Sequence, residues 1–117
     1  MKKRDGMSAS HLALVRKLPC CVCLSDEGCQ AHHLGISEER GIGQKASDQW
    51  AVPLCVMCHA RLHTFGFTRH PEILLNWGVN GKALARRLWH LSHNKEGGIA
   101  PLTRMRATVK QGYRVTA

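Results

Sequence analysis

Two C-x2-C pairs constrain the fold of this chain more than any other feature. The pairs are Cys20-x2-Cys23 and Cys55-x2-Cys58, and 31 residues separate them. Cysteines at this spacing are typical of zinc sites, and a site with four thiolate ligands has no open position for a substrate. We therefore predict one structural zinc site, which requires the two pairs to meet in space. In small zinc peptides, zinc binding supplies roughly 10–16 kcal/mol of folding free energy.

Disulfide bonds are the alternative for a chain with six cysteines. The first residues, Met1 to Gly6, are mostly charged and lead into no apolar run, so we expect no secretory signal and a cytoplasmic protein. In that setting paired cysteines indicate zinc before disulfides. Cys21 competes with Cys20 for the first pair, but its spacing to Cys23 is poorer. Cys29 is expected to be a buried, inert thiol.

The net charge of +9 is concentrated at the two ends of the chain. Residues 1–18 carry five basic and one acidic side chain, and residues 82–117 carry eight basic and one acidic. Residues 19–72, which contain the predicted metal ligands, carry four basic and six acidic side chains. Basic flanks around such a site favour a polyanion bound through its phosphates, so we predict a nucleic acid as a partner. The alternative is a basic surface that only keeps the protein soluble.

The length and the apolar pattern predict one small α+β domain over residues 8–93. The expected elements are a helix over 8–18, a strand over 29–34, a loop over 35–49, a strand over 50–54, and helices over 58–65, 71–77 and 82–93. Residues 1–7 and 94–117 show no convincing period, so we expect basic, flexible tails there. No stretch approaches the ~20 apolar residues of a membrane span, and no membrane partner is predicted.

Two groups of histidines lie on these predicted elements. His59 and His63 are four residues apart on a predicted helix, so both rings lie on one face. His32 and His33 are neighbours on a predicted strand, so one should face the helix and the other should face elsewhere. Added to four cysteines, these histidines are too many for one site and predict a second, open metal site. The remaining histidines have no partner in this pattern and are assigned to the surface or core: His11, His70, His90 and His93.

The order strand, loop, strand and helix, with a cysteine pair at each end, resembles the HNH (ββα-metal) endonuclease superfamily over about residues 19–66. The details are similar to the phage-type branch that includes the Ref recombination nuclease. The supporting motifs are Ala31-His32-His33, Gly41-Ile42-Gly43-Gln44-Lys45-Ala46-Ser47-Asp48, Val52-Pro53-Leu54-Cys55 and Cys58-His59-x3-His63. The resemblance implies a zinc-stabilised ββα-metal core with flanking helices, an endonuclease that hydrolyses DNA phosphodiester bonds, and a bacterial host cell. A host recombinase filament as partner is implied only by the likeness to Ref.

Roles follow from the resemblance by position. Three histidines would bind the catalytic ion, Mg²⁺ or Zn²⁺: His32, His59 and His63. His33 would be the general base. The family usually has Asn about nine residues before the first helix histidine, and here Trp50 occupies that position. Asp48 is predicted to act in its place, either orienting His33 or adding a carboxylate ligand that would favour Mg²⁺; capping a turn is the alternative role.

Five basic residues are predicted to contact nucleic acid: Lys45, Arg61, Arg69, Arg86 and Arg87. Solvated surface charges are the alternative for each. The second function considered is a non-catalytic zinc adaptor that binds DNA or protein, and the third is a redox role for Cys21 and Cys29. An adaptor needs four ligands, and the additional histidines favour a nuclease. The metal content separates the two: one tight zinc ion per chain indicates an adaptor, and a further exchangeable ion indicates a nuclease.

Overall fold

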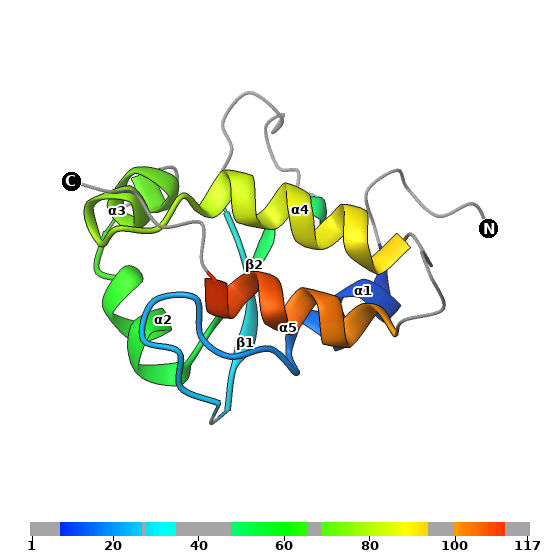
Figure 1. Cartoon of the computed structure of the whole chain (residues 1–117). Coiled ribbons are helices and arrows are strands. Elements are labelled where there is room, and N and C mark those ends of the chain that lie inside the picture. Colours follow the sequence, from blue (N-terminus) through cyan, green and yellow to red (C-terminus); the bar gives the residue numbers. More distant parts are fainter. Residues whose placement is uncertain (1–7, 27, 35–47, 66–68, 94–99, 112–117) are drawn as a thin grey trace.

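The computed structural model describes residues 8–26, 28–34, 48–65, 69–93 and 100–111. Over these residues the protein is a small α+β structure with five α-helices and a two-stranded antiparallel sheet (Figure 1). The elements in chain order are α1 (Ala9–Val15), β1 (Gln30–His33), the 3-10 turn η2 (Asp48–Trp50), β2 (Ala51–Leu54), α2 (Val56–Leu62), α3 (His70–Asn76), α4 (Gly81–His93) and α5 (Pro101–Gln111). None of the described helices is long and apolar enough to cross a membrane.

The hairpin of β1 and β2 places the two adjacent histidines on opposite faces. His32 pairs with Val52 and His33 with Ala51. Because side chains alternate along a strand, His32 is buried whereas His33 is partly exposed. All of β2 is buried, in agreement with its apolar sequence. The two predicted strands are confirmed, each slightly shorter than expected, and residues 35–47 of the predicted loop lie outside the described part of the chain.

Helix α1 starts where the sequence predicts and ends early. Ser8 is its N-cap, and the Ser8 hydroxyl accepts a hydrogen bond from the backbone N–H of His11 at 3.2 Å. The helix ends at Val15 and not at the predicted Leu18, because the chain tightens there. The N–H of Lys17 donates to Leu14, and that of Leu18 donates to Val15.

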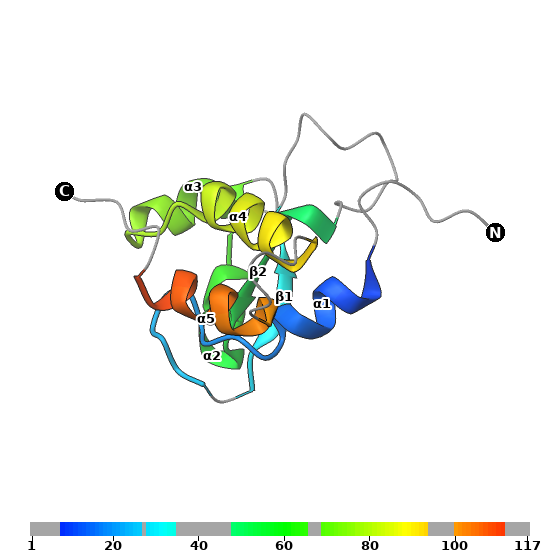
Figure 2. The same ribbon diagram turned by 45° about the vertical axis from the view of Figure 1, so that its right-hand side comes forward.

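Helix α4 is the central packing element. It packs against α1, α3, α5, η2 and β2. Figures 1 and 2 both show α4 and α5 side by side, and in Figure 1 they lie in front of the hairpin. The apolar stripe of α4 recurs every three or four residues and is buried, as an amphipathic helix requires: Leu84, Leu88 and Leu91.

The prediction of a flexible tail after residue 93 is wrong over residues 101–111, which form α5. Leu102, Met105 and Val109 follow a three- and four-residue spacing, so they lie on one face of this helix. Met105 and Val109 are buried in the core, and Leu102 packs against it. At the exposed side, the Arg106 guanidinium donates a hydrogen bond to the Lys17 carbonyl at 3.2 Å. The rest of the predicted tails, residues 1–7, 94–99 and 112–117, lies outside the described residues.

Candidate metal centres and catalytic site

Four cysteines from two turns form one compact group, the cysteine cluster: Cys20, Cys23, Cys55 and Cys58. Their sulfur atoms all lie within 4.8 Å of one another, and the Sγ atoms of Cys23 and Cys55 are 3.7 Å apart. Four sulfurs at the usual zinc distance of about 2.3 Å lie about 3.8 Å apart in a tetrahedron. The predicted cysteines therefore come together and could hold one zinc ion. All six cysteines of the chain are free thiols.

Backbone hydrogen bonds hold the first cysteine turn in place and act on the Cys20 thiol. The N–H of Cys20 donates to Ser25 at 2.8 Å, and the N–H of Cys21 donates to Pro53 at 3.0 Å, which ties this turn to β2. Burial opposes ionisation of the Cys20 thiol, but hydrogen bonds from backbone N–H groups, led by that of Cys23, lower its pKa to about 7. Thiolates are the form that binds zinc, so the backbone favours metal binding at Cys20. At Cys23, the backbone hydrogen bond of Ser25 is outweighed by burial and by the neighbouring cysteine thiols, and the pKa is raised.

The second cysteine turn also begins helix α2. Cys55 is the N-cap, and its sulfur accepts a hydrogen bond from the N–H of Cys58 at 3.5 Å. The helix carries His59 and ends at its C-cap, His63. The predicted helix over 58–65 is confirmed in place, although it starts and ends a few residues earlier. The cysteine cluster therefore fixes the start of the helix that carries two of the predicted histidine ligands.

Three histidines form a second group, the histidine cluster: His32, His59 and His63. One nitrogen of each lies within 4.8 Å of the others, and the Nε2 atoms of His59 and His63 are 2.9 Å apart. The ring centroids of His32 and His59 are 4.9 Å apart, so His32 is the strand histidine that faces the helix. His32 is buried and His63 is exposed, which opens one side of the cluster to solvent.

Burial favours the neutral form of His32 and His59. Together with the neighbouring imidazoles, first His59 and then His70, it lowers the pKa of His32 from 6.5 to about 3. Burial also lowers the pKa of His59. Neutral imidazole is the form that binds a metal ion. Three imidazole nitrogens with one open side fit the donor set of a catalytic zinc-type ion.

The other strand histidine, His33, forms a pair with Asp48. The Nε2 atom of His33 lies 2.7 Å from Oδ1 of Asp48, and Oδ2 of Asp48 accepts a hydrogen bond from the Ser8 N–H at 2.7 Å. Asp48 is almost completely buried, and the His33 side chain is 31% exposed. An ionised carboxylate only accepts hydrogen bonds, so His33 donates from Nε2 and its Nδ1 carries the free lone pair. The structure thus brings the two predicted catalytic residues together.

The structure adds two site residues that sequence analysis missed. His70 was expected to have no partner in the motif, which is wrong: its Nδ1 atom lies 3.0 Å from Nε2 of His32. It is buried on α3, 38 residues further along the chain. Ser8, which holds Asp48, is 40 residues from it. No local spacing signals either contact, because both depend on how the helices pack against the hairpin.

The predicted nucleic-acid contacts near α2 are exposed, but both have neighbours within the protein. The Arg61 guanidinium lies 5.2 Å from the ring centroid of Trp77, a cation–π distance. Arg69 lies 3.8 Å from the carboxylate of Glu72. Lys45 lies outside the described residues.

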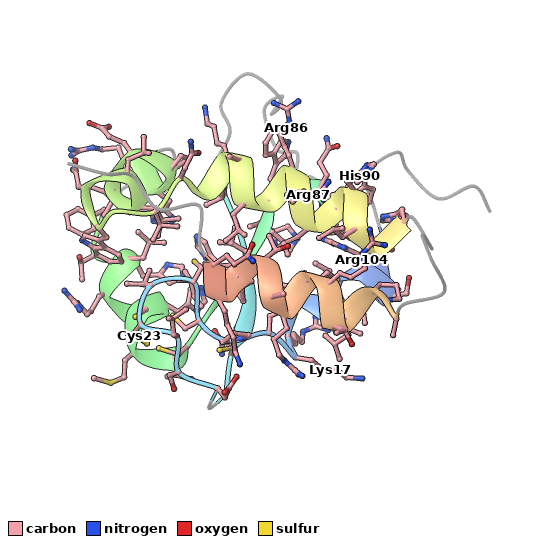
Figure 3. The ribbon with its side chains drawn as sticks, in the orientation of Figure 1. Lys17, Cys23, Arg86, Arg87, His90 and Arg104 are labelled. Atoms are coloured by element: carbon pink, nitrogen blue, oxygen red, sulfur yellow. The ribbon has the colours of Figure 1, made fainter. Side chains whose placement is uncertain are left out.

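Helices α4 and α5 present a basic surface. Figure 3 shows Arg86, Arg87 and His90 on α4 and Arg104 on α5, with Lys17 below α5 in this view. Neither helix contains Asp or Glu, and neither does α1. The exposed basic residues of the two helices are Lys82, Arg86, Arg87, Arg106 and Lys110. This surface therefore carries positive charge that no carboxylate of these helices offsets.

A family model described as a protein of unknown function (DUF968) matches residues 1–67, more than half of the chain. The chain belongs to the DUF968 family. The DUF968 match contains α1, the hairpin and α2, and with them the whole cysteine cluster, the whole histidine cluster and the pair of His33 and Asp48. It ends before His70 and the helices α3, α4 and α5. Comparisons with curated proteins and with solved structures give no match.

Proposed function

We propose that this DUF968 protein is a metal-dependent endonuclease of the HNH (ββα-metal) type that hydrolyses DNA phosphodiester bonds. The observation that carries the proposal is the contact between His33 and Asp48. His33 is the next residue in the strand after His32, a candidate metal ligand. Hydrolysis of a phosphodiester requires a base for the attacking water and a cation for the phosphate oxygens. A zinc adaptor would require only the cysteine cluster.

His33 would act as the general base through Nδ1, since its Nε2 donates to Asp48. The buried Asp48 carboxylate would hold the ring in this orientation and stabilise the positive charge that His33 gains with the proton. The Ser8 N–H would in turn keep the carboxylate in place. General base assistance of this kind is worth roughly 10²–10⁴-fold in rate.

The histidine cluster would hold the catalytic ion. When bound, such an ion supplies charge stabilisation at the phosphate and at the leaving 3′ oxygen. Asp48 is not among the described groups that could hold a metal, and its two oxygens contact His33 and Ser8 instead. The donors are then three imidazoles, which favour a zinc-type ion over the Mg²⁺ that an added carboxylate would favour. The exposed side at His63 leaves room for the phosphate.

The basic surface of α4 and α5 would bind the DNA backbone. Phosphate contacts supply most non-specific affinity and read no bases, so this surface predicts salt-dependent binding without sequence preference. The bacterial cytoplasm as the setting, and a host recombinase filament as a partner, are part of the proposal on the resemblance to the phage-type branch alone.

The test is nicking of supercoiled plasmid by wild type and by His33→Ala. The protein is first treated with a mild chelator that leaves the cysteine zinc in place, and Zn²⁺, Mn²⁺ or Mg²⁺ is then added. We expect wild type to nick DNA and His33→Ala to lose at least about 10²-fold in rate. DNA affinity and metal content should not change in the variant. His93→Ala, which removes an exposed histidine outside both clusters, is the matched control and should nick as wild type does.

The adaptor function would replace the nuclease if fully loaded wild type binds DNA and cuts none. That result must hold for duplex, single-stranded and branched substrates, with and without a recombinase filament. A His33→Ala protein that nicks at the wild-type rate would instead remove His33 from the mechanism.

A further inference from the structure

We infer that His70 is a positioning residue of the histidine cluster, which holds His32 by a direct nitrogen–nitrogen contact and so determines which His32 nitrogen faces the bound cation. The inference rests on the proposed metal-dependent function and adds a residue outside the part of the chain that the family model matches. It also assigns a role to α3, the helix on which His70 lies.

The two nitrogens of His70 have different neighbours. Nε2 lies 3.3 Å from the backbone carbonyl oxygen of Phe65, and Nδ1 lies 3.0 Å from Nε2 of His32. A carbonyl oxygen only accepts hydrogen bonds, so the neutral His70 ring carries its proton on Nε2. Its Nδ1 then accepts rather than donates, and Nε2 of His32 lies on that side.

The contact determines the tautomer of His32. Nδ1 of His70 lies 3.0 Å from Nε2 of His32. With the lone pair on Nδ1, a hydrogen bond between these two atoms forms only if Nε2 of His32 donates it. His32 therefore carries its proton on Nε2, which leaves Nδ1 as the nitrogen that can bind a cation. Metal-binding histidines commonly donate their other ring N–H to a fixed acceptor, and this bond sets both orientation and affinity.

The position of His70 is rigid enough for this role. The residue is only 1% exposed, and Ile73 and Leu74 of the same helix are buried in the core. A second partner, Phe65, lies three residues after α2, the helix that carries His59 and is capped by His63. His70 thus connects the strand and the helix that together supply the three ligand candidates.

A buried histidine that only fills space is the simpler explanation, and a fourth metal ligand is another. A residue that only fills space needs no nitrogen at hydrogen-bond distance from a ligand candidate, whereas Nδ1 of His70 lies 3.0 Å from Nε2 of His32. A fourth ligand would have to approach all three histidines, yet His70 does not belong to the group whose nitrogens lie within 4.8 Å of one another. Within the cluster, the nitrogen–nitrogen contact of His70 at hydrogen-bond distance is the one with His32.

The first test uses two substitutions of His70. His70→Phe keeps a ring of similar size but removes both nitrogens, whereas His70→Asn keeps an acceptor near the position of Nδ1. The probe is Co²⁺ binding to the histidine cluster of full-length protein whose cysteine cluster is already loaded with zinc. We expect His70→Phe to weaken Co²⁺ binding about 10–100-fold, and His70→Asn to retain most of the affinity. Zinc content and thermal unfolding show whether each variant is folded.

A second measurement needs no substitution. Imidazole nitrogen NMR of the wild type loaded with ¹¹³Cd should show the cadmium coupled to Nδ1 of His32 and not to His70. Unchanged Co²⁺ affinity in a folded His70→Phe protein would overturn the inference, and so would cadmium coupling to Nε2 of His32 or to His70. If wild type binds no cation at the histidine cluster, the proposed function itself fails, which is a separate and distinguishable result.

Discussion

The cysteine cluster and the histidine cluster share helix α2 but differ in exposure and in completeness. The cysteine cluster offers four sulfurs, three of them on buried residues. The histidine cluster offers three nitrogens and is exposed at His63. A closed set of four ligands suits a structural ion, and an open set of three leaves a position for water or substrate. One short helix therefore begins at a closed set of four ligand candidates and ends at an open set of three.

The neighbours of the two clusters differ as well. Backbone N–H groups donate to Cys20 and Cys55 of the cysteine cluster, and at Cys20 they favour the thiolate. Side chains surround the histidine cluster: His70 contacts His32 on one side, and the pair of His33 and Asp48 lies on the other face of the same strand. Both clusters join distant parts of the chain, but the cysteine ligands lie in short turns with backbone donors, whereas the proposed chemistry depends on side-chain contacts.

Breaking the cysteine cluster has the largest expected effect. Cys58→Ser removes one thiolate, and the loss of zinc should lower the free energy of unfolding by more than about 5 kcal/mol, which is comparable to the stability of a small domain. Because Cys55 and Cys58 begin α2, the histidine cluster should be lost with it. Zinc content and thermal unfolding followed by circular dichroism measure both effects.

Cys29→Ser is the matched control for that experiment. Cys29 lies outside the cluster, and burial raises the pKa of its thiol to about 11, so it stays protonated. This variant should keep its zinc. A Cys58→Ser protein that binds zinc and unfolds as wild type does would refute a structural role for the cluster.

A change at Asp48, which contacts His33, should lower the rate of plasmid nicking and leave the metal content unchanged. Asp48→Asn keeps the shape of the side chain but removes the charge that would stabilise protonated His33. We expect kcat for plasmid nicking to fall by roughly 10²–10³-fold, about 3–4 kcal/mol in barrier height. The metal content of both clusters should not change. Asp26→Asn, which alters an exposed carboxylate, is the control, and wild-type kcat in Asp48→Asn would rule out the orienting role.

The pH dependence of the free energy of unfolding includes a contribution from His11, which lies outside both clusters. His11 is buried, and burial is the main cause that lowers its pKa from 6.5 to about 4. Between these two pH values the unfolded chain binds more protons than the folded chain, so stability falls as the pH is lowered through this window. The total loss from this residue is about 3 kcal/mol, complete near pH 4.

The measurement is urea unfolding between pH 7 and pH 4 for wild type and His11→Gln, both loaded with zinc. Any loss of metal by protonation of ligands is common to both proteins, so the difference between their pH slopes isolates His11. Wild type should lose more stability than the variant over this range. Parallel slopes would show that His11 titrates alike in the folded and unfolded chains.

The smallest expected effect concerns the first cysteine turn. Leu24 follows Cys23 with φ of +64°, a left-handed conformation that costs residues other than glycine roughly 1–2 kcal/mol. Leu24→Gly should raise the free energy of unfolding by about 0.5 kcal/mol, since part of the relief is offset by the freedom of glycine in the unfolded chain. Leu75→Gly, at another exposed leucine but inside α3, should lower it by about 1 kcal/mol. Equal effects of the two substitutions would contradict this account.

The predictions from sequence succeeded where a short spacing fixes geometry. C-x2-C turns, a pair of histidines four apart on a helix and two adjacent histidines on a strand each set their own local arrangement, so the two clusters followed from the sequence. The pairing of His33 with Asp48 was one of the roles proposed for Asp48, and the structure shows that contact.

Tertiary packing determined what the sequence did not reveal. Helix α5 was missed because its apolar face has only three large residues among basic and polar ones, and this face becomes stable only against α4. The contact of His70 with His32, and that of Ser8 with Asp48, join residues about 40 positions apart. Such contacts arise from the relative placement of helices, which no local pattern encodes.

The two halves of the cysteine cluster lie on either side of the segment between Leu34 and Asp48, and so do β1 and β2. A peptide bond broken within that segment would leave an amino-terminal piece with Cys20, Cys23 and β1, and a carboxyl-terminal piece with Cys55, Cys58 and β2. One zinc ion with two thiolates from each piece, together with the strand pairing, would replace the lost covalent link. Two separately produced fragments would accordingly assemble when zinc is supplied and separate when it is removed.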